Sequence, residues 1–355
     1  MSVKVNKKLS LVQIARALAI LFVLLGHANT LFYNHFKYQW FNVSEWGRTG
    51  GVDFFFVVSG FMIYYLYSKH IGKKDKAKEF LLKRVLRIYP LYWIFTAAAL
   101  FMFIIFPQLG DGHEKNPLVI LKSIFLLPVD PILVVTWSLS HVVLFYLVFT
   151  FAIVKPNITK PLVGVWILFS LLVSFKVPGF SEFHYFLFSF NNIEILCGCL
   201  IAYLILNFKM KYPTLITLTG FLLVISVWIN NIYNGLNDIT IYLYCLSSML
   251  IMLGISSIDL QKETKTPKLF QFLGDASYSI YISHGPLLQF YILVLTKLHT
   301  IEKLGVPFCM LIAIALAFLS GCLVYIIVEK PISVLLKNKF LNKKVKPTES
   351  IVLTK

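Results

Sequence analysis

Arg16 and His27 are two residues of the first apolar stretch whose side chains could do chemistry together. They are eleven residues apart. That spacing is about three helical turns, which places both on one face with a rise of about 16 Å between them. A fixed cation and a titratable imidazole suit an anionic part of a substrate and a proton transfer, respectively. A snorkelling arginine and a helix-capping histidine would give the same spacing.

A second pair of cations, Arg84 and Arg87, stands just before another apolar stretch. At a spacing of i, i+3 the two side chains share a helical face. Paired guanidinium groups bind phosphate oxygens in a bidentate manner. The alternative is a topology anchor at the membrane interface, with Tyr92 and Trp93 in the aromatic belt behind it.

Further ionisable residues lie within apolar stretches, where each costs about 2.5–3.5 kcal/mol on insertion scales. They are Asp53, His141, Glu194, Asp275 and His284. Singly, each fits a satisfied packing residue, but together with Arg16 and His27 they indicate a polar cavity inside a helical bundle. Ser277, Tyr281 and His284 form a stripe, since residues i and i+7 return to nearly the same helical face. The stripe either lines this cavity or joins neighbouring helices.

The composition shows what must position these residues. The chain has 355 residues, of which 58% are hydrophobic and 14% are charged. This excludes an ordinary soluble domain, a disordered chain and a disulfide-stapled scaffold. The net charge of +17 indicates topology and anionic lipid rather than nucleic acid, because the basic residues punctuate apolar stretches. Neither the cysteines nor the scattered histidines have metal-site spacing, so no metal is expected.

Stretches long enough to cross a bilayer predict an all-α integral membrane protein with about ten transmembrane helices around a polar cavity. They cover 9–31, 51–67, 88–106, 136–154, 160–176, 186–207, 213–232, 238–258, 270–296 and 306–328. The segment 117–135 is expected to stay outside the membrane as a loop, because Pro128 and Pro131 interrupt it. We expect one transmembrane domain over 1–335 and a basic tail over 336–355.

The positive charges predict how the helices are oriented. With the N-terminus in the cytoplasm, the cytoplasmic segments hold 25 Lys and Arg residues, the outer loops hold 7, and Arg16 lies in the first helix. The alternation has no exception along the ten stretches. The positive-inside rule therefore predicts a protein of the cytoplasmic membrane with both termini in the cytoplasm.

Seven motifs, in order, resemble the membrane acyltransferase-3 family over about residues 10–335. They are Arg16-x10-His27, GVDFFFVVSGF at 51–61, KRVLRIYPLYW at 83–93, TWSLSHVVLFY at 136–146, NNIEILCGCLIAY at 191–203, LGDASYSIYISHGP at 273–286 and VEKP at 328–331. The chain looks most similar to the branch that O-acylates exopolysaccharides and other surface glycans.

The resemblance implies an O-acyltransferase, most simply an O-acetyltransferase, that uses cytoplasmic acyl-CoA and no permanently bound cofactor. His27 is then the catalytic residue with Arg16 as its companion, while Arg84, Arg87 and Tyr92 hold coenzyme A. The cavity group is expected to comprise Trp137, His141, Glu194, Ser277, Tyr281 and His284. Direct transfer and a ping-pong route through an acyl-enzyme are both compatible with these residues.

Val142 departs from the family pattern, which usually has Glu directly after the histidine of the TWSLSH motif. Valine can neither orient an imidazole nor compensate a cation. Either another acid, Asp53 or Glu194, takes that role, or the chain is an impaired relative that only binds acyl-CoA. We place Asp53 in the catalytic group; a plain helix cap is its alternative.

The rival class is a transporter or flippase of lipid-linked glycans, whose intramembrane charges would coordinate a moving substrate. The expected partners are acyl-CoA, an extracytoplasmic or lipid-linked glycan and membrane lipids, with no nucleic acid; a homo-oligomer stays open. Tyr33, Tyr38, Trp40 and Trp46 of the outer loops could stack on sugar rings or belong to the interfacial belt.

Overall fold

The computed structural model describes residues 9–40, 48–106, 112–128, 130–180, 182, 186–234, 239–262 and 264–341. Among these residues the helices are joined by turns and loops, and there is no β-strand. The helices are α1 (Ser10–Phe36), α2 (Gly51–Tyr67), α3 (Ala77–Ile105), α4 (Pro117–Ile124), α5 (Trp137–Val154), α6 (Pro156–Ser174), α7 (Phe190–Asn207), α8 (Pro213–Asn234), α9 (Thr240–Gln261), α10 (Lys268–Lys297), α11 (Thr300–Leu304), α12 (Val306–Val324) and α13 (Lys330–Phe340). A π-helical turn, η7 (Tyr325–Glu329), joins α12 to α13.

Ten of the described helices are long and apolar enough to cross a membrane, which confirms the predicted all-α, multi-pass architecture. The largest difference is at α3, which begins at Ala77 rather than near residue 88, so Arg84 and Arg87 lie inside the helix. The described residues of the segment 117–135 form the short α4, turns and the start of a 3-10 helix, η5 (Val134–Thr136), and no helix long enough to cross a membrane. Residues 342–355 of the expected basic tail, and Trp46 of the outer loops, lie outside the described residues.

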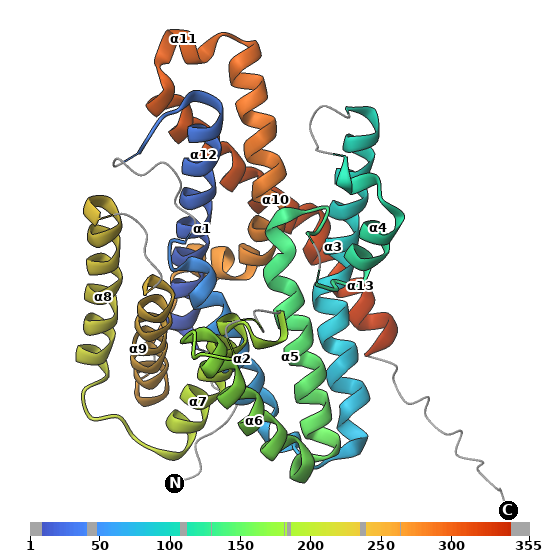
Figure 1. The fold of residues 1–355 in the computed structure, drawn as a ribbon, viewed down its shortest axis with the longest axis vertical. Coiled ribbons are helices and arrows are strands. Elements are labelled where there is room, and N and C mark those ends of the chain that lie inside the picture. Colours follow the sequence, from blue (N-terminus) through green and yellow to red (C-terminus); the bar gives the residue numbers. More distant parts are fainter. Residues whose placement is uncertain are drawn as a thin grey trace, which may run out of the picture.

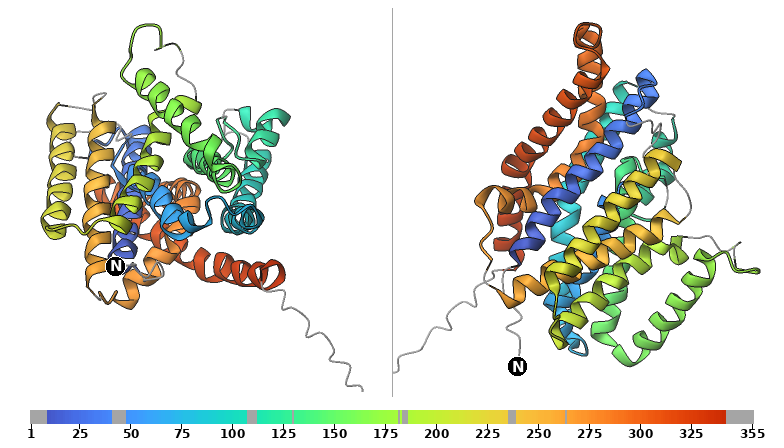
Figure 2. Two further views of the ribbon diagram at one scale, coloured as in Figure 1. Left: turned by 90° about the horizontal axis from the view of Figure 1, so that it is seen from below. Right: turned by 90° about the vertical axis from the view of Figure 1, so that its left-hand side faces the viewer.

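The central helices of the bundle are α1 and α2 (Figures 1 and 2). α8 and α9 pack together on one side, α10 and α12 form a second pair, and α3 and α5 lie across the bundle from α8 (Figure 1). α1 packs against α10, and α2 packs against α7. Residues from four distant parts of the sequence therefore meet near the centre.

The α2–α7 contact depends on two glycines. A Cβ atom at Gly60 would lie 1.7 Å from the carbonyl oxygen of Ile195, and one at Gly198 would lie 2.0 Å from that of Val57. Small residues permit such close backbone approach between membrane helices. Asp53 lies seven residues before Gly60 and Glu194 lies four before Gly198. Both spacings return to the contact face, so close packing brings the two carboxylates together.

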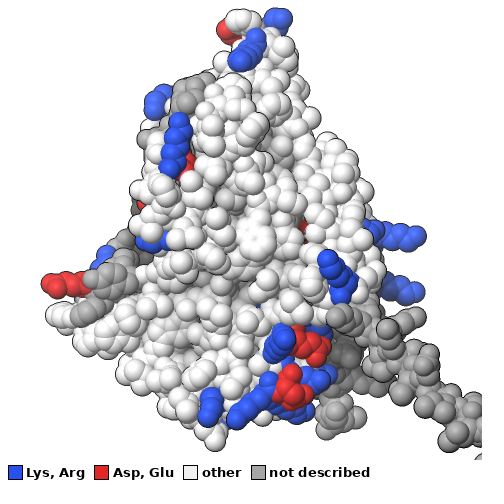
Figure 3. Space-filling model, turned by 90° about the vertical axis from the view of Figure 1, so that its right-hand side faces the viewer, with Lys and Arg blue, Asp and Glu red and all other residues white. Residues whose placement is uncertain are grey.

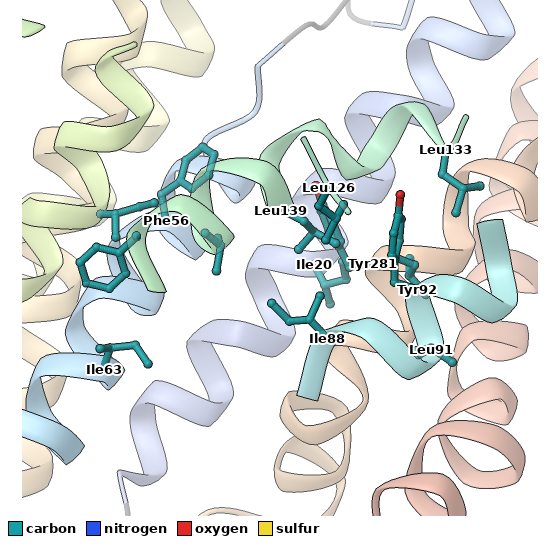
Figure 4. Packing of buried hydrophobic residues seen from close by; sticks show 14 of the residues in the cluster. Ile20, Phe56, Ile63, Ile88, Leu91, Tyr92, Leu126, Leu133, Leu139 and Tyr281 are labelled. Atoms are coloured by element: carbon teal, nitrogen blue, oxygen red, sulfur yellow. The ribbon is translucent and has the colours of Figure 1, made fainter. Parts of the chain in front are cut away.

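A buried apolar cluster joins α1, α2, α3, α5 and α10 around the same centre. Figure 4 shows its members Ile20, Phe56, Ile88, Leu139 and Tyr281. In a bilayer such a cluster is held mainly by van der Waals packing, since lipid tails are as apolar as the side chains. The cluster therefore fixes the relative positions of the helices that carry the polar residues.

The outer surface of the bundle is apolar, and large exposed side chains such as Leu147, Leu168, Leu222 and Leu319 face outward. Figure 3 looks onto the side that carries α3 and α13. Charged side chains gather in the lower part of this face, at its upper tip and along its two edges, and leave much of its centre uncharged. An apolar surface of this kind is one that lipid tails cover.

Candidate active site

A cavity of about 980 Å³, here called the basic cavity, lies between the first turns of α3, η7 and α13. Its charged lining residues are the cations Lys78, Lys83, Arg84, Arg87, Lys330 and Lys337 and the acids Asp75, Glu79, Asp275 and Glu329. Because the cations outnumber the carboxylates, the cavity attracts anions.

The two arginines of this cavity are held in different ways. Arg84 donates from Nη2 to the Tyr67 hydroxyl over 3.0 Å, with its guanidinium 5.1 Å from the centre of that ring. Arg87 forms an ion pair with buried Glu329, which also accepts a hydrogen bond from Ser279 Oγ at 2.5 Å. Arg84 has no ion-pair partner among the described residues, so its charge remains available to a ligand.

A second, narrow cavity of about 240 Å³ begins at Arg84 and Arg87, which line both spaces. Its walls are mostly apolar, from α2, α3 and α5. Arg16 lines it and donates to Ser277 Oγ over 2.8 Å and to Gln13 over 3.1 Å. The narrow cavity therefore suits a slender, mainly apolar group with a polar attachment point.

Ser138 and Tyr281 also line the narrow cavity. The Tyr281 hydroxyl donates to the Val135 carbonyl over 2.6 Å, and Ser138 Oγ lies 2.7 Å from the same hydroxyl. Because the tyrosine proton is already committed, Ser138 is the donor of that second bond. These hydrogen bonds fix both side chains in place.

A third space of about 220 Å³, the histidine cavity, is lined by His27, Thr30, Arg48, Thr49 and Trp137, together with Val23, Gly26 and Val52. Val52 also lines the narrow cavity, so the two adjoin. The three cavities thus follow one another from the basic side chains of α3 to the imidazole of His27.

Arg48 is held by a buried cluster beside the histidine cavity. Its Nε lies 2.7 Å from Asp53 Oδ1, and its Nη2 lies 2.7 Å from Asn191 Oδ1 and 3.6 Å from Glu194 Oε2. Both carboxylate side chains are fully buried. Burial by itself lowers the pKa of Arg48, but the carboxylates of Asp53 and Glu194 outweigh it and raise the pKa, so the guanidinium stays charged.

The imidazole of His27 also contacts a residue of α10. The imidazole rings of His27 and His284 lie 4.9 Å apart between centroids, at an interplanar angle of 61°. His284 is fully buried, and its Nδ1 lies 2.6 Å from the Tyr281 carbonyl oxygen. α1 and α10 therefore place two histidines side by side, and His27 of this pair lines the histidine cavity.

Comparison with known proteins shows the family to which the chain belongs. The model of the acyltransferase domain matches residues 11–327. This chain belongs to the acyltransferase-3 family. The match confirms the resemblance seen in the motifs, and it identifies a membrane acyltransferase, which requires an acyl donor and an acceptor.

This acyltransferase is also similar to the exopolysaccharide production protein ExoZ of Rhizobium meliloti (strain 1021). The two are 27% identical over 303 residues, which cover 79% of this chain and 88% of ExoZ. No solved structure matches the chain.

The acyltransferase brings most of the predicted site residues to the three cavities. Arg84 and Arg87 line the basic and narrow cavities, and Arg16, Ser277 and Tyr281 line the narrow cavity. His27 and Trp137 line the histidine cavity. Around it lie Asp53, Glu194 and His284. Among the described residues, no group of three or more potential metal ligands is found.

Two further predicted residues, Tyr92 and His141, neither line these cavities nor contact the side chains of His27 or Arg48. Tyr92 is fully buried, and its hydroxyl donates over 2.5 Å to the Ser123 carbonyl, which ties α3 to α4. His141 is bonded to Asn192 at 2.8 Å and stacks on Phe186, with ring centroids 4.3 Å apart. His141 contacts Trp137 edge-on and so lies one layer behind the histidine cavity.

Arg48 is the site residue that sequence reasoning missed. Its place in an outer loop between two apolar stretches indicates only a positive charge of that loop. Its spacing of five residues from Asp53 held a usable signal, because a buried acid next to a helix start calls for a nearby cation. Its pairing with Glu194 had no local signal.

Proposed function

We propose that this chain is an O-acyltransferase that moves an acyl group, most simply acetyl, from cytoplasmic acyl-CoA to a hydroxyl of an extracytoplasmic glycan or its lipid-linked precursor. The observation that carries the proposal is the succession of three adjoining cavities, from a basic one to one lined by His27. Donor and acceptor can thus approach the same imidazole from opposite ends.

The chemistry of coenzyme A fits the first two cavities. Its nucleotide and phosphates match the volume and excess positive charge of the basic cavity, where Arg84 is not paired with an acid of the described residues. Its pantetheine arm is slender and matches the narrow cavity, in which Arg16 and Ser277 can hold a polar group. The thioester then lies near Ser138, Tyr281 and the entrance to the histidine cavity.

His27 acts as the general base in this proposal. It takes the proton of the acceptor hydroxyl while the acceptor oxygen attacks the thioester carbonyl carbon. Arg48 lines the same cavity and offers N–H donors to the developing oxyanion. The intermediate collapses with cleavage of the C–S bond, and the CoA thiolate takes the proton from His27. An ester and free CoA result.

The orientation follows from the charge distribution. The segment 68–87, which leads into the basic cavity, is rich in lysine and arginine. The positive-inside rule places it, and both termini, in the cytoplasm of a cell whose cytoplasmic membrane holds the protein. The histidine cavity then belongs to the outer half of the bundle.

The residues that line the histidine cavity fit a sugar as the acceptor. Trp137 offers an aromatic face, and Thr30, Thr49 and Arg48 offer hydrogen-bonding groups in a space of about 220 Å³. The relationship to a protein named for exopolysaccharide production points to a surface polysaccharide as the acceptor. Asp53 and Glu194 act indirectly, by holding Arg48.

Val142 favours a second candidate function, in which this chain binds acyl-CoA without transferring the acyl group. Its side chain is buried at the wall of the narrow cavity, beside a path that the acyl donor would use. A glutamate there would stand in the same cavity as three arginines. Valine provides no compensating charge, so activity of the chain as it stands is the point to test.

The test is release of free CoA by the purified protein in nanodiscs, with and without a cell-envelope glycan fraction. We expect glycan-dependent release, a loss of about 10²–10⁴-fold in kcat for His27→Ala, and unchanged binding of acyl-CoA to that variant. Activity only in Val142→Glu would identify an impaired enzyme. An unchanged rate of CoA release in His27→Ala would exclude His27 as the general base. No CoA release by the wild type or by any variant would favour a binding or transport role.

A further inference from the structure

We infer that His284 is the positioning residue of His27: it accepts a hydrogen bond from one ring nitrogen of His27 and so presents the other as the base. The inference rests on the proposed acyl transfer, because it assigns His27 the role of base. It is carried by the hydrogen-bond inventory of two adjacent rings on α1 and α10.

The protons of His284 can be assigned from its partner. Nδ1 lies 2.6 Å from the Tyr281 carbonyl oxygen, which can only accept a hydrogen bond. Nδ1 therefore carries the proton. In the neutral ring, Nε2 then carries a lone pair and seeks a donor.

That lone pair has no partner. Nε2 of His284 is buried without a hydrogen bond among the described residues. Leaving a buried polar atom unsatisfied costs about 1–3 kcal/mol. The Tyr281 ring is 5.8 Å away, but its hydroxyl is committed to Val135. The other ring of the described residues in contact with His284 is His27, at 4.9 Å between centroids.

His27 is the complementary half of the pair. It lines the histidine cavity and makes no hydrogen bond within the described part of the chain. Its neutral ring holds one N–H and one lone pair. When the ring turns its N–H towards His284 Nε2, both unsatisfied groups are paired at once, and the lone pair of His27 is left for the acceptor hydroxyl.

The hydrogen bond between His27 and His284 stabilises the reaction intermediate as well as the resting orientation of the His27 ring. After His27 takes the acceptor proton it is an imidazolium, and its hydrogen bond to His284 becomes charge-assisted. Such bonds are roughly twice as strong as those between neutral groups. His284 thus stabilises the charged intermediate more than the ground state, which is the condition for a rate effect.

Two replacements of His284 separate this role from packing. Leu removes the acceptor at similar bulk, whereas the side-chain oxygen of Gln can take the place of Nε2. We expect His284→Leu to lower kcat by about 10–100-fold, as loss of an orienting partner commonly does, with the KM for acyl-CoA unchanged. His284→Gln should keep most of the rate. His299→Leu, at an exposed histidine of the α10–α11 connection, is the matched control.

A second readout does not depend on acyl transfer. Carbethoxylation of His27 by diethylpyrocarbonate, followed by mass spectrometry, reports the nucleophilicity of its free ring nitrogen. The reaction should be slower in His284→Leu and restored in His284→Gln. Equal carbethoxylation rates in wild type, His284→Leu and His284→Gln would overturn the inference. Absence of glycan-dependent CoA release in the wild type would overturn the proposed function, while this second readout still tests the histidine pair.

Discussion

Arginines stand at both ends of the cavity path, but their surroundings differ. Arg48 is fixed by Asp53 and Glu194, whose side chains are fully buried. Arg84 rests on the ring and hydroxyl of Tyr67 and has no carboxylate partner in the described part of the chain. The same residue type is therefore locked into the protein at one end and kept available for an anion at the other.

This contrast separates stability from binding. Removing one partner from a buried ion pair leaves an uncompensated charge, which is more costly than the pair itself. Removing a cation that faces an open cavity and has no carboxylate partner leaves no buried charge uncompensated. A substitution of Arg48 should thus lower the stability of the protein, whereas a substitution of Arg84 should weaken the binding of acyl-CoA.

Arg48→Met should give the larger effect. It leaves two buried carboxylates without a cation, so we expect a loss of about 3–5 kcal/mol in stability. Thermal unfolding of the purified protein in nanodiscs measures it as a lower melting temperature.

The control for Arg48 is a variant that removes all three charges. Arg48→Met combined with Asp53→Asn and Glu194→Gln should regain much of the lost stability, because no buried charge remains. If Arg48→Met melts like the wild type, the cluster does not hold α2 and α7 in the way described.

Arg84→Met should give the smaller effect, confined to binding. Loss of one charge-assisted contact to a phosphate costs about 1.5–3 kcal/mol, so the KM for acyl-CoA should rise by at least about tenfold. The melting temperature should not change. Lys297→Met, at the opposite end of the bundle, controls for loss of a positive charge. An unchanged KM would return Arg84 to the role of a topology anchor.

The membrane helices could be predicted because their signal is local. Ten apolar stretches of sufficient length predict ten spans, and the described residues contain ten helices long and apolar enough to cross a membrane, none of them within 117–135. The predicted start of α3 was wrong by eleven residues, since hydropathy detects the bilayer and not the end of a helix: five of the residues 77–87 are charged, but the segment is still helical.

The site was predictable only in part, because its contacts cross the chain. The Arg16–His27 spacing predicts two points on one helix, and the two residues do line different, adjoining cavities. The contact between His27 and His284 depends on how α1 packs against α10. The Arg48–Glu194 pair depends on the close approach of α2 and α7 at Gly60 and Gly198. The catalytic roles of these residues stay predictions.

The central claim, transfer across the membrane through adjoining cavities, is tested most directly with sided proteoliposomes. Acyl-CoA is confined to one side and the glycan acceptor to the other, and the protein's orientation is determined by protease cleavage of a C-terminal tag. We predict acylated glycan only when acyl-CoA is on the side of segment 68–87 and the glycan is on the opposite side. Transfer that requires both on the same side would contradict the claim.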